Sequence, residues 1–181
     1  FSTDGIHDLI HLFKDRIDYF KSELDEGIYD AMNKGVKHAT GDTISFLNAG
    51  DVATEYYFKP ITKLNEMGAD YCYSGIIVKG SKSSFRYMPR ELDSKTEYFQ
   101  RMPFPHPSLF VKRSVFEDIG YFDVKLQITA DHEWIVRLIQ SPNKGVLCKE
   151  HTMAFYLNGK SLSIVVHIEM YKTSRVYGRK T

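Results

Sequence analysis

Helical and strand patterns alternate along this chain, and this alternation constrains its fold more than any other feature. Apolar residues at helical spacing predict helices over residues 5–14, 29–39, 56–67, 114–119 and 131–140. Short runs of β-branched and aromatic residues predict strands over residues 17–23, 43–47, 69–78, 84–88, 108–111 and 151–156. Such alternation predicts a largely parallel sheet with helices on both faces. Ligands of such sheets bind beyond the carboxyl ends of strands, so we expect chemistry in the loops after Leu47 and before Asp131.

The composition fits one compact domain without a charge-driven partner. A chain of 181 residues with 43% apolar residues can bury one sizeable core. The net charge of +1 gives no overall field that attracts nucleic acid, so an anionic ligand needs a local site. Cys72 and Cys148 have apolar neighbours, which is typical of buried thiols in a reducing compartment. No apolar run approaches the length of a membrane span, and we expect a cytoplasmic protein.

A long, ordered set of motifs resembles one enzyme family. The most informative stretch, residues 22–51, contains Asn33-Lys34-Gly35, Gly41-Asp42 and the strand-ending Asn48-Ala49-Gly50-Asp51. Further motifs follow in the same order at residues 73–75, 106–113, 119–123, 130–134 and 158–161. Together they resemble the inverting glycosyltransferases of family 2, which have the GT-A fold.

The resemblance implies a fold and a domain organisation. It implies an α/β, GT-A-like domain over residues 1–163, with a mostly parallel sheet and helices on both faces. We expect residues 164–181 to form a basic C-terminal helix. The family's first strand and helix have no counterpart here, so we expect a domain that is incomplete at its N-terminus.

The resemblance also implies an activity. It predicts transfer of a single sugar from a nucleoside-diphosphate sugar, with UDP as the expected nucleotide, to an acceptor hydroxyl with inversion. The expected acceptor is a glycan or a lipid-linked molecule, in polysaccharide or glycoconjugate synthesis. The Gln-x-x-Arg-Trp motif of processive synthases is absent from the sequence, which favours transfer of one sugar.

Asp51 and Asn48 are the predicted metal ligands. A departing nucleoside diphosphate gathers negative charge, which Mg²⁺ or Mn²⁺ held by a carboxylate neutralises. Asn48 and Gly50 occupy two positions that are often acidic in the family, so Asp51 is the charged ligand of this motif. The alternative interpretation is a strand-ending turn in which Asn and Gly tolerate left-handed backbone.

Asp131 is the predicted catalytic base. Inverting transfer needs a carboxylate within hydrogen-bond reach of the acceptor hydroxyl, and the family's base lies at the start of this helix. An aspartate at a helix start also serves as a cap, which is the structural alternative. Glu133 is a neighbouring carboxylate that could take the same role, although its position two residues further along a helix points it elsewhere.

Four other residues are predicted to contact substrate. The resemblance assigns Asp4, Asn33 and Lys34 to the nucleotide; Asp4 could instead cap a helix, and Lys34 could be an ordinary solvated charge. His106 lies between Pro105 and Pro107, which fixes the direction of its imidazole, and we expect it to contact a sugar hydroxyl or a phosphate. A satisfied structural histidine is the alternative.

Two broader alternatives stay open at this point. The metal motif has a single acidic residue, Asp51, so it also fits a catalytically weakened protein that binds nucleotide sugars or acts as a scaffold. The basic tail over residues 164–181 is expected to pack onto the domain, and peripheral contact with the inner face of a membrane is the other interpretation.

Overall fold

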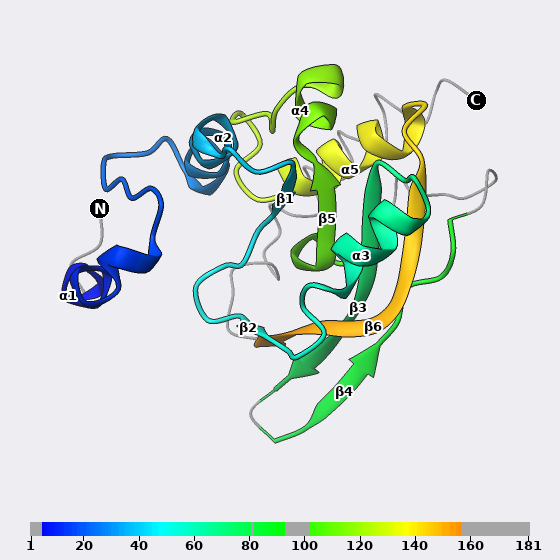
Figure 1. The fold of residues 1–181 in the computed structure, drawn as a ribbon, viewed down its shortest axis with the longest axis horizontal. Coiled ribbons are helices and arrows are strands. Elements are labelled where there is room, and N and C mark those ends of the chain that lie inside the picture. The colour runs from blue at the N-terminus through cyan, green and yellow to red at the C-terminus, as the bar shows by residue number, and fades with distance from the viewer. Residues whose placement is uncertain (1–4, 81, 93–101, 157–181) are drawn as a thin grey trace.

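A six-stranded sheet forms the centre of the protein (Figure 1). The computed structural model describes residues 5–80, 82–92 and 102–156. The strands of the sheet are β1 (Thr43–Ser45), β2 (Val52–Ala53), β3 (Tyr71–Lys79), β4 (Ser84–Tyr87), β5 (Leu109–Lys112) and β6 (Gly145–Tyr156). Their spatial order is β1-β5-β3-β6-β2, with β4 pairing with β3 as well. The long strand β3 is central, as its aromatic and β-branched run predicts.

The sheet is mixed, whereas the sequence pattern predicted mostly parallel pairing. Only β3 and β6 run parallel among the described strands, and the other pairings are antiparallel. Strand β4 must reverse because a tight turn follows β3, closed by the Gly80 N–H donating to Ser83 O at 2.8 Å. Strand β6 follows two helices, and such helical crossovers allow a strand to return parallel.

Helices cover both faces of the sheet, in agreement with the sequence. They are α1 (Ile6–Leu12), α2 (Ile28–His38), α3 (Lys59–Glu66), α4 (Arg113–Ile119) and α5 (Ala130–Gln140), with short 3-10 helices η1 (Lys14–Arg16) and η2 (His106–Ser108). Successive side chains of β3 point to opposite faces of the sheet. Cys72 packs with Leu64 of α3 on one face, and Tyr71 belongs to the core cluster that contains Trp134 of α5 on the other. Both cysteines are buried free thiols.

The strand expected over residues 17–23 does not form, because this apolar run finds no partner strand. The described residues between η1 and α2 have no regular structure, and Tyr19 and Phe20 are exposed there. None of the helices within the described ranges has both the length and the apolar character needed to cross a bilayer. The helix expected over residues 164–181 lies outside the described residues.

An aromatic core fixes the loop that leads to α5. Trp134 is fully buried and stacks on Phe116, with ring centroids 4.5 Å apart. Its indole N–H donates to the carbonyl of Gly120 at 2.7 Å. Gly120 ends α4 with a φ of 84°, a conformation that favours glycine, and it therefore turns the chain back over the core. The start of α5 is held in place by these contacts.

Candidate active site

Asp131 lies in the first turn of α5, and one of its two carboxylate oxygens accepts hydrogen bonds from the protein. The Tyr29 hydroxyl lies 2.9 Å from Oδ1, and the His132 backbone N–H donates to the same oxygen at 2.8 Å. Both hydrogen bonds that the described residues make to this carboxylate therefore end at Oδ1. The side chain is partly exposed. This arrangement orients the carboxylate and leaves Oδ2 available to accept a hydrogen bond from a bound hydroxyl group.

The neighbouring carboxylate of Glu133 is already engaged in an ion pair. Arg137 binds it through two hydrogen bonds, Nε to Oε1 at 2.8 Å and Nη2 to Oε2 at 2.9 Å. The same guanidinium donates to the carbonyl of Tyr121 at 2.7 Å and to the carbonyl of Ile119. Arg137 thus ties α5 to the end of α4, and Glu133 holds the guanidinium in that position. Between the two carboxylates, the geometry favours Asp131 as the reactive one.

His106 is buried beside Asp131 with an unpaired ring nitrogen. The residue is 4% exposed, and Nε2 has no hydrogen-bond partner among the described residues. Burial lowers the pKa of His106, while the charge of Asp131 acts in the opposite direction. A buried polar atom without a partner is costly, and in native proteins it often marks a place where a ligand or water binds. His106 is accordingly suited to contact a substrate.

Aromatic rings bring four separate segments together around these two residues. The His106 ring stacks on Phe46, which follows β1, with centroids 5.3 Å apart, and meets Phe122 edge-on at 5.6 Å. Phe122 also packs against Tyr29 of α2 at 5.6 Å. The end of β1, the start of α2, η2 and the start of α5 thus meet at one place, although they lie far apart in sequence.

Asp51 ends the loop that leaves β1, five residues after Phe46. The turn is closed by the Asp51 N–H donating to the carbonyl of Asn48 at 3.0 Å, and Gly50 adopts a φ of 92°. The turn predicted as the structural alternative is therefore real. Asn48 takes part in it through its backbone, and the ligand role of its side chain stays a prediction.

The Asp51 carboxylate is partly buried at the end of this turn. Its Oδ2 is buried and makes no hydrogen bond to the described residues. Burial raises the pKa of Asp51, and a hydrogen bond from the Asn48 backbone partly offsets that effect. Within residues 5–80, 82–92 and 102–156, no three or more His, Cys, Asp or Glu side chains gather closely enough to hold a metal ion. The metal-ligand role of Asp51 therefore stays a prediction.

Asn33 is predicted to contact the nucleotide, but the structure uses its side chain to join two segments of the protein. Its amide nitrogen donates to the carbonyl of Phe122 at 2.9 Å, and its oxygen accepts from the Phe122 N–H at 3.0 Å. The side chain is buried. This reciprocal pair fixes the loop before α5 against α2. The geometry favours loop positioning as the main role of Asn33.

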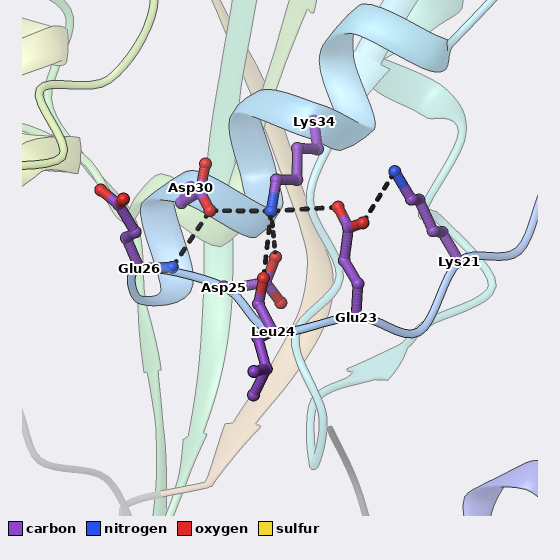
Figure 2. A network of polar contacts seen from close by, with 7 residues as sticks. All are labelled: Lys21, Glu23, Leu24, Asp25, Glu26, Asp30 and Lys34. Carbon is purple, nitrogen blue, oxygen red and sulfur yellow. Dashed lines mark hydrogen bonds and ion pairs between the residues drawn. The ribbon is translucent and has the colours of Figure 1, made fainter.

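Lys34 is also predicted to contact the nucleotide, and Figure 2 shows its ammonium group surrounded by carboxylates of its own chain. Nζ lies 2.8 Å from Asp25, 2.8 Å from Asp30 and 3.1 Å from Glu23. Hydrogen bonds to Asp25, then Asp30 and Glu23, raise the pKa of Lys34. This network, called here the Lys34 network, fastens the segment before α2 to the helix. A nucleotide base or ribose would have to compete with these carboxylates for the Lys34 ammonium group. The third predicted nucleotide contact, Asp4, lies outside the described residues.

A cavity of about 630 Å³ opens between the start of α2 and the loop before α5. Its lining residues are Glu26, Gly27, Ile28, Tyr29, Asp30, Val124, Leu126, Gln127 and Ile128. Tyr29 belongs to this wall, and its hydroxyl reaches Asp131. Tyr29 thus lies between the cavity and the predicted base, which is not itself a lining residue. Sequence reasoning placed Tyr29 on the apolar face of a helix and missed this contact, although a buried phenol needs a polar partner.

Comparisons with known proteins point to one family. The family model described as Glycosyl transferase family 2 matches residues 1–122. Over 149 residues the chain is 27% identical to a PGL/p-HBAD biosynthesis glycosyltransferase of Mycobacterium bovis, covering 78% of this chain and 56% of the relative. It is 30% identical to an uncharacterized glycosyltransferase of Mycobacterium tuberculosis, covering 74% and 54%. The chain thus spans about half the length of these curated relatives.

Solved structures agree on the fold. The S. aureus TarS 1–349 complex with UDP-GlcNAc superimposes with a TM-score of 0.74 at 16% identity, covering 98% of this chain and 54% of the TarS 1–349 chain. GalNAc-T7 with UDP, GalNAc and Mn²⁺ superimposes with a TM-score of 0.65 at 15% identity, covering 98% and 40%. At such low identity the likeness concerns the fold alone, and it confirms the α/β, GT-A-like architecture.

Proposed function

The chain belongs to glycosyl transferase family 2, and from this premise we propose that it transfers a single sugar from a UDP-sugar to an acceptor hydroxyl with inversion. The observation that carries the proposal is the state of Asp131, whose Oδ1 is held by Tyr29 and His132 while Oδ2 receives no hydrogen bond from the described residues. The neighbouring His106 offers an unpaired Nε2 to a sugar or phosphate oxygen. The names of the similar proteins, with UDP-GlcNAc in one and PGL/p-HBAD biosynthesis in another, support transfer of a sugar from a nucleotide.

The proposed reaction needs one proton acceptor on the acceptor side of the sugar. Oδ2 of Asp131 takes the proton of the acceptor hydroxyl while that oxygen bonds to the anomeric carbon. The bond between the anomeric carbon and the diphosphate oxygen breaks on the opposite face, so the configuration inverts. Because Oδ1 is fixed by two hydrogen bonds, the carboxylate loses little freedom when it enters this geometry.

Asp51 would hold a divalent ion for the departing diphosphate. Mg²⁺ or Mn²⁺ supplies positive charge that stabilises the leaving group, and GalNAc-T7 is described with Mn²⁺. The buried Oδ2 of Asp51 would be one ligand and the amide oxygen of Asn48 a second. Mg²⁺ is commonly bound by only one or two protein carboxylates, together with phosphate and water oxygens, so a single carboxylate is compatible with this role.

The cavity beside Tyr29 is the proposed place of the acceptor. Ile28, Leu126 and Ile128 give it an apolar wall, which suits the apolar part of a lipid-linked acceptor or the flat face of a sugar ring. Tyr29 lines this cavity and contacts Asp131, so in this proposal an acceptor hydroxyl would reach the base past the Tyr29 side chain. The nucleotide would bind on the other side of the reacting sugar, where Asp51 lies in this proposal.

The test of the proposed function is a product analysis with the 181-residue chain. Different UDP-sugars are incubated with Mn²⁺ and a set of neutral glycan and lipid-linked acceptors, and the anomeric configuration of the product is read by NMR. We expect an inverted linkage with one donor, and loss of product when EDTA removes the metal. Retained configuration would contradict the role of Asp131. Thermal stabilisation by a sugar nucleotide without any product would instead support the alternative of a binding or scaffold protein.

A further inference from the structure

One buried tyrosine lies between the proposed base and the loop that precedes it. Tyr29 is 6% exposed, and its ring is held by Phe122. Its hydroxyl lies 2.9 Å from Asp131 Oδ1 and 2.5 Å from the carbonyl oxygen of Ile128. A phenol has one proton to donate, so these two acceptors compete for it.

We propose that Tyr29 is a positioning residue that serves Asp131 in both of its protonation states, donating to the ionised carboxylate before transfer and to the Ile128 carbonyl afterwards. This inference rests on the proposed function, in which Asp131 is the base. It assigns to Tyr29 a role beyond packing.

The ionised carboxylate attracts the phenolic proton more strongly. A hydrogen bond from an O–H to a carboxylate is charge-assisted and is about twice as strong as one between neutral groups. Before transfer the proton of Tyr29 therefore points at Oδ1, which keeps Oδ2 directed toward the acceptor. The His132 N–H, at 2.8 Å from Oδ1, supports the same orientation.

After transfer, Asp131 has gained the acceptor's proton and is neutral, so its pull on the phenolic proton falls. The Ile128 carbonyl is then the stronger hydrogen-bond acceptor for the Tyr29 hydroxyl. The phenolic proton turns toward this carbonyl without any movement of heavy atoms. No covalent bond to Tyr29 forms or breaks, and its proton returns when Asp131 ionises again. Because the hydroxyl has an acceptor in each state, neither state leaves a buried donor unpaired.

The packing of Tyr29 explains how a single hydroxyl can reach both partners. Tyr29 is the second residue of α2, and Asn33 ties the same helix to Phe122 one turn later. Ile128 and Asp131 come from one loop and the helix that follows it. The contacts that join α2 to the loop before α5 therefore hold the Tyr29 hydroxyl close to both Asp131 and Ile128.

The variant that tests this role removes only the hydroxyl group of Tyr29. Tyr29→Phe keeps the ring and its packing, and we expect kcat to fall by about tenfold or more, which corresponds to the loss of one charge-assisted hydrogen bond. The KM for the UDP-sugar should change by less than about twofold, because the donor binds elsewhere. Steady-state kinetics of the 181-residue chain, with circular dichroism as a check on folding, measures both.

Tyr73→Phe is the matched control. Tyr73 is also buried, and its hydroxyl accepts a hydrogen bond from the Leu92 N–H at 3.0 Å, so this variant likewise loses one buried hydroxyl. We expect its kcat to stay close to that of the unaltered protein. An unchanged kcat in Tyr29→Phe, or an equal fall in both variants, would overturn the role of Tyr29 while leaving sugar transfer in place. Absence of transfer by the unaltered chain would overturn the proposed function and this role together.

Discussion

Replacing Asp131 with asparagine is expected to slow sugar transfer by roughly 10²- to 10⁴-fold, the usual contribution of a positioned general base. Asparagine has nearly the same shape, so its oxygen can still accept from the Tyr29 hydroxyl and the His132 N–H. What it loses is the ability to take a proton. The loss should therefore fall on kcat, and the KM for the donor should stay within a few fold. Initial rates at saturating donor measure this effect.

The matched control is Glu133→Gln, two residues further along α5. This change weakens the ion pair with Arg137, whose guanidinium would keep its charge in a mostly buried place. We expect this variant to lose thermal stability and to retain turnover at temperatures where it is folded. A fall of less than about tenfold in Asp131→Asn, or a larger fall in Glu133→Gln, would show that Asp131 is not the base.

Replacing Asp51 with asparagine is expected to abolish stimulation by Mn²⁺ and to lower transfer by about 10²-fold or more, since a bound metal stabilises developing charge by several kcal/mol. The protein itself should not become less stable. Burial raises the pKa of Asp51 above its ordinary value of 3.8, so the ionised form costs folding free energy at neutral pH. Removing that charge removes the cost.

The raised pKa of Asp51 predicts how the stability of the protein depends on pH. A carboxyl group with a raised pKa lowers stability as the pH rises through and above its unfolded-state value. Without metal, the free energy of unfolding of the unaltered protein should therefore fall relative to Asp51→Asn as the pH rises above about 4, the ordinary range of an aspartate. Urea titrations between acid and neutral pH measure the difference. Asp118→Asn, which changes an exposed carboxylate of α4, is the control and should show neither effect.

The same substitution separates two accounts of the Asn48 to Asp51 turn. If Asp51 only shaped the turn, its loss would cost stability and leave metal dependence unchanged. A less stable variant that still responds to Mn²⁺ would therefore contradict the metal role of Asp51.

The parts of the fold that depend on local pattern could be predicted from the sequence. Gly120 ends α4 in the predicted place, and α5 covers nearly the residues that its amphipathic pattern indicates. The direction of the strands was predicted wrongly, as mostly parallel, because alternating helices and strands along the chain do not fix which strands become neighbours in the sheet.

The candidate site was predictable where a motif carried it and not where distant side chains meet. Asp131 and His106 come from ordered motifs, and the structure brings them together. Tyr29 meets Asp131 across 102 residues of sequence, and Asn33 meets Phe122 across 89. Such contacts depend on the packing of α2 against the loop before α5, which no local pattern encodes. The Lys34 network is closer in sequence, yet its carboxylates alone did not indicate that they would surround Lys34.

In the proposed reaction, Asp51 and Asp131 act on the same bound UDP-sugar from opposite ends. A crystal structure of the 181-residue chain with UDP and Mn²⁺ would show whether they do. We expect Mn²⁺ at the buried Oδ2 of Asp51 beside the diphosphate, with Oδ2 of Asp131 facing across the same cleft and room for one sugar between them. A diphosphate bound away from Asp51, or an Asp131 carboxylate that opens onto a different surface, would rule out this shared site.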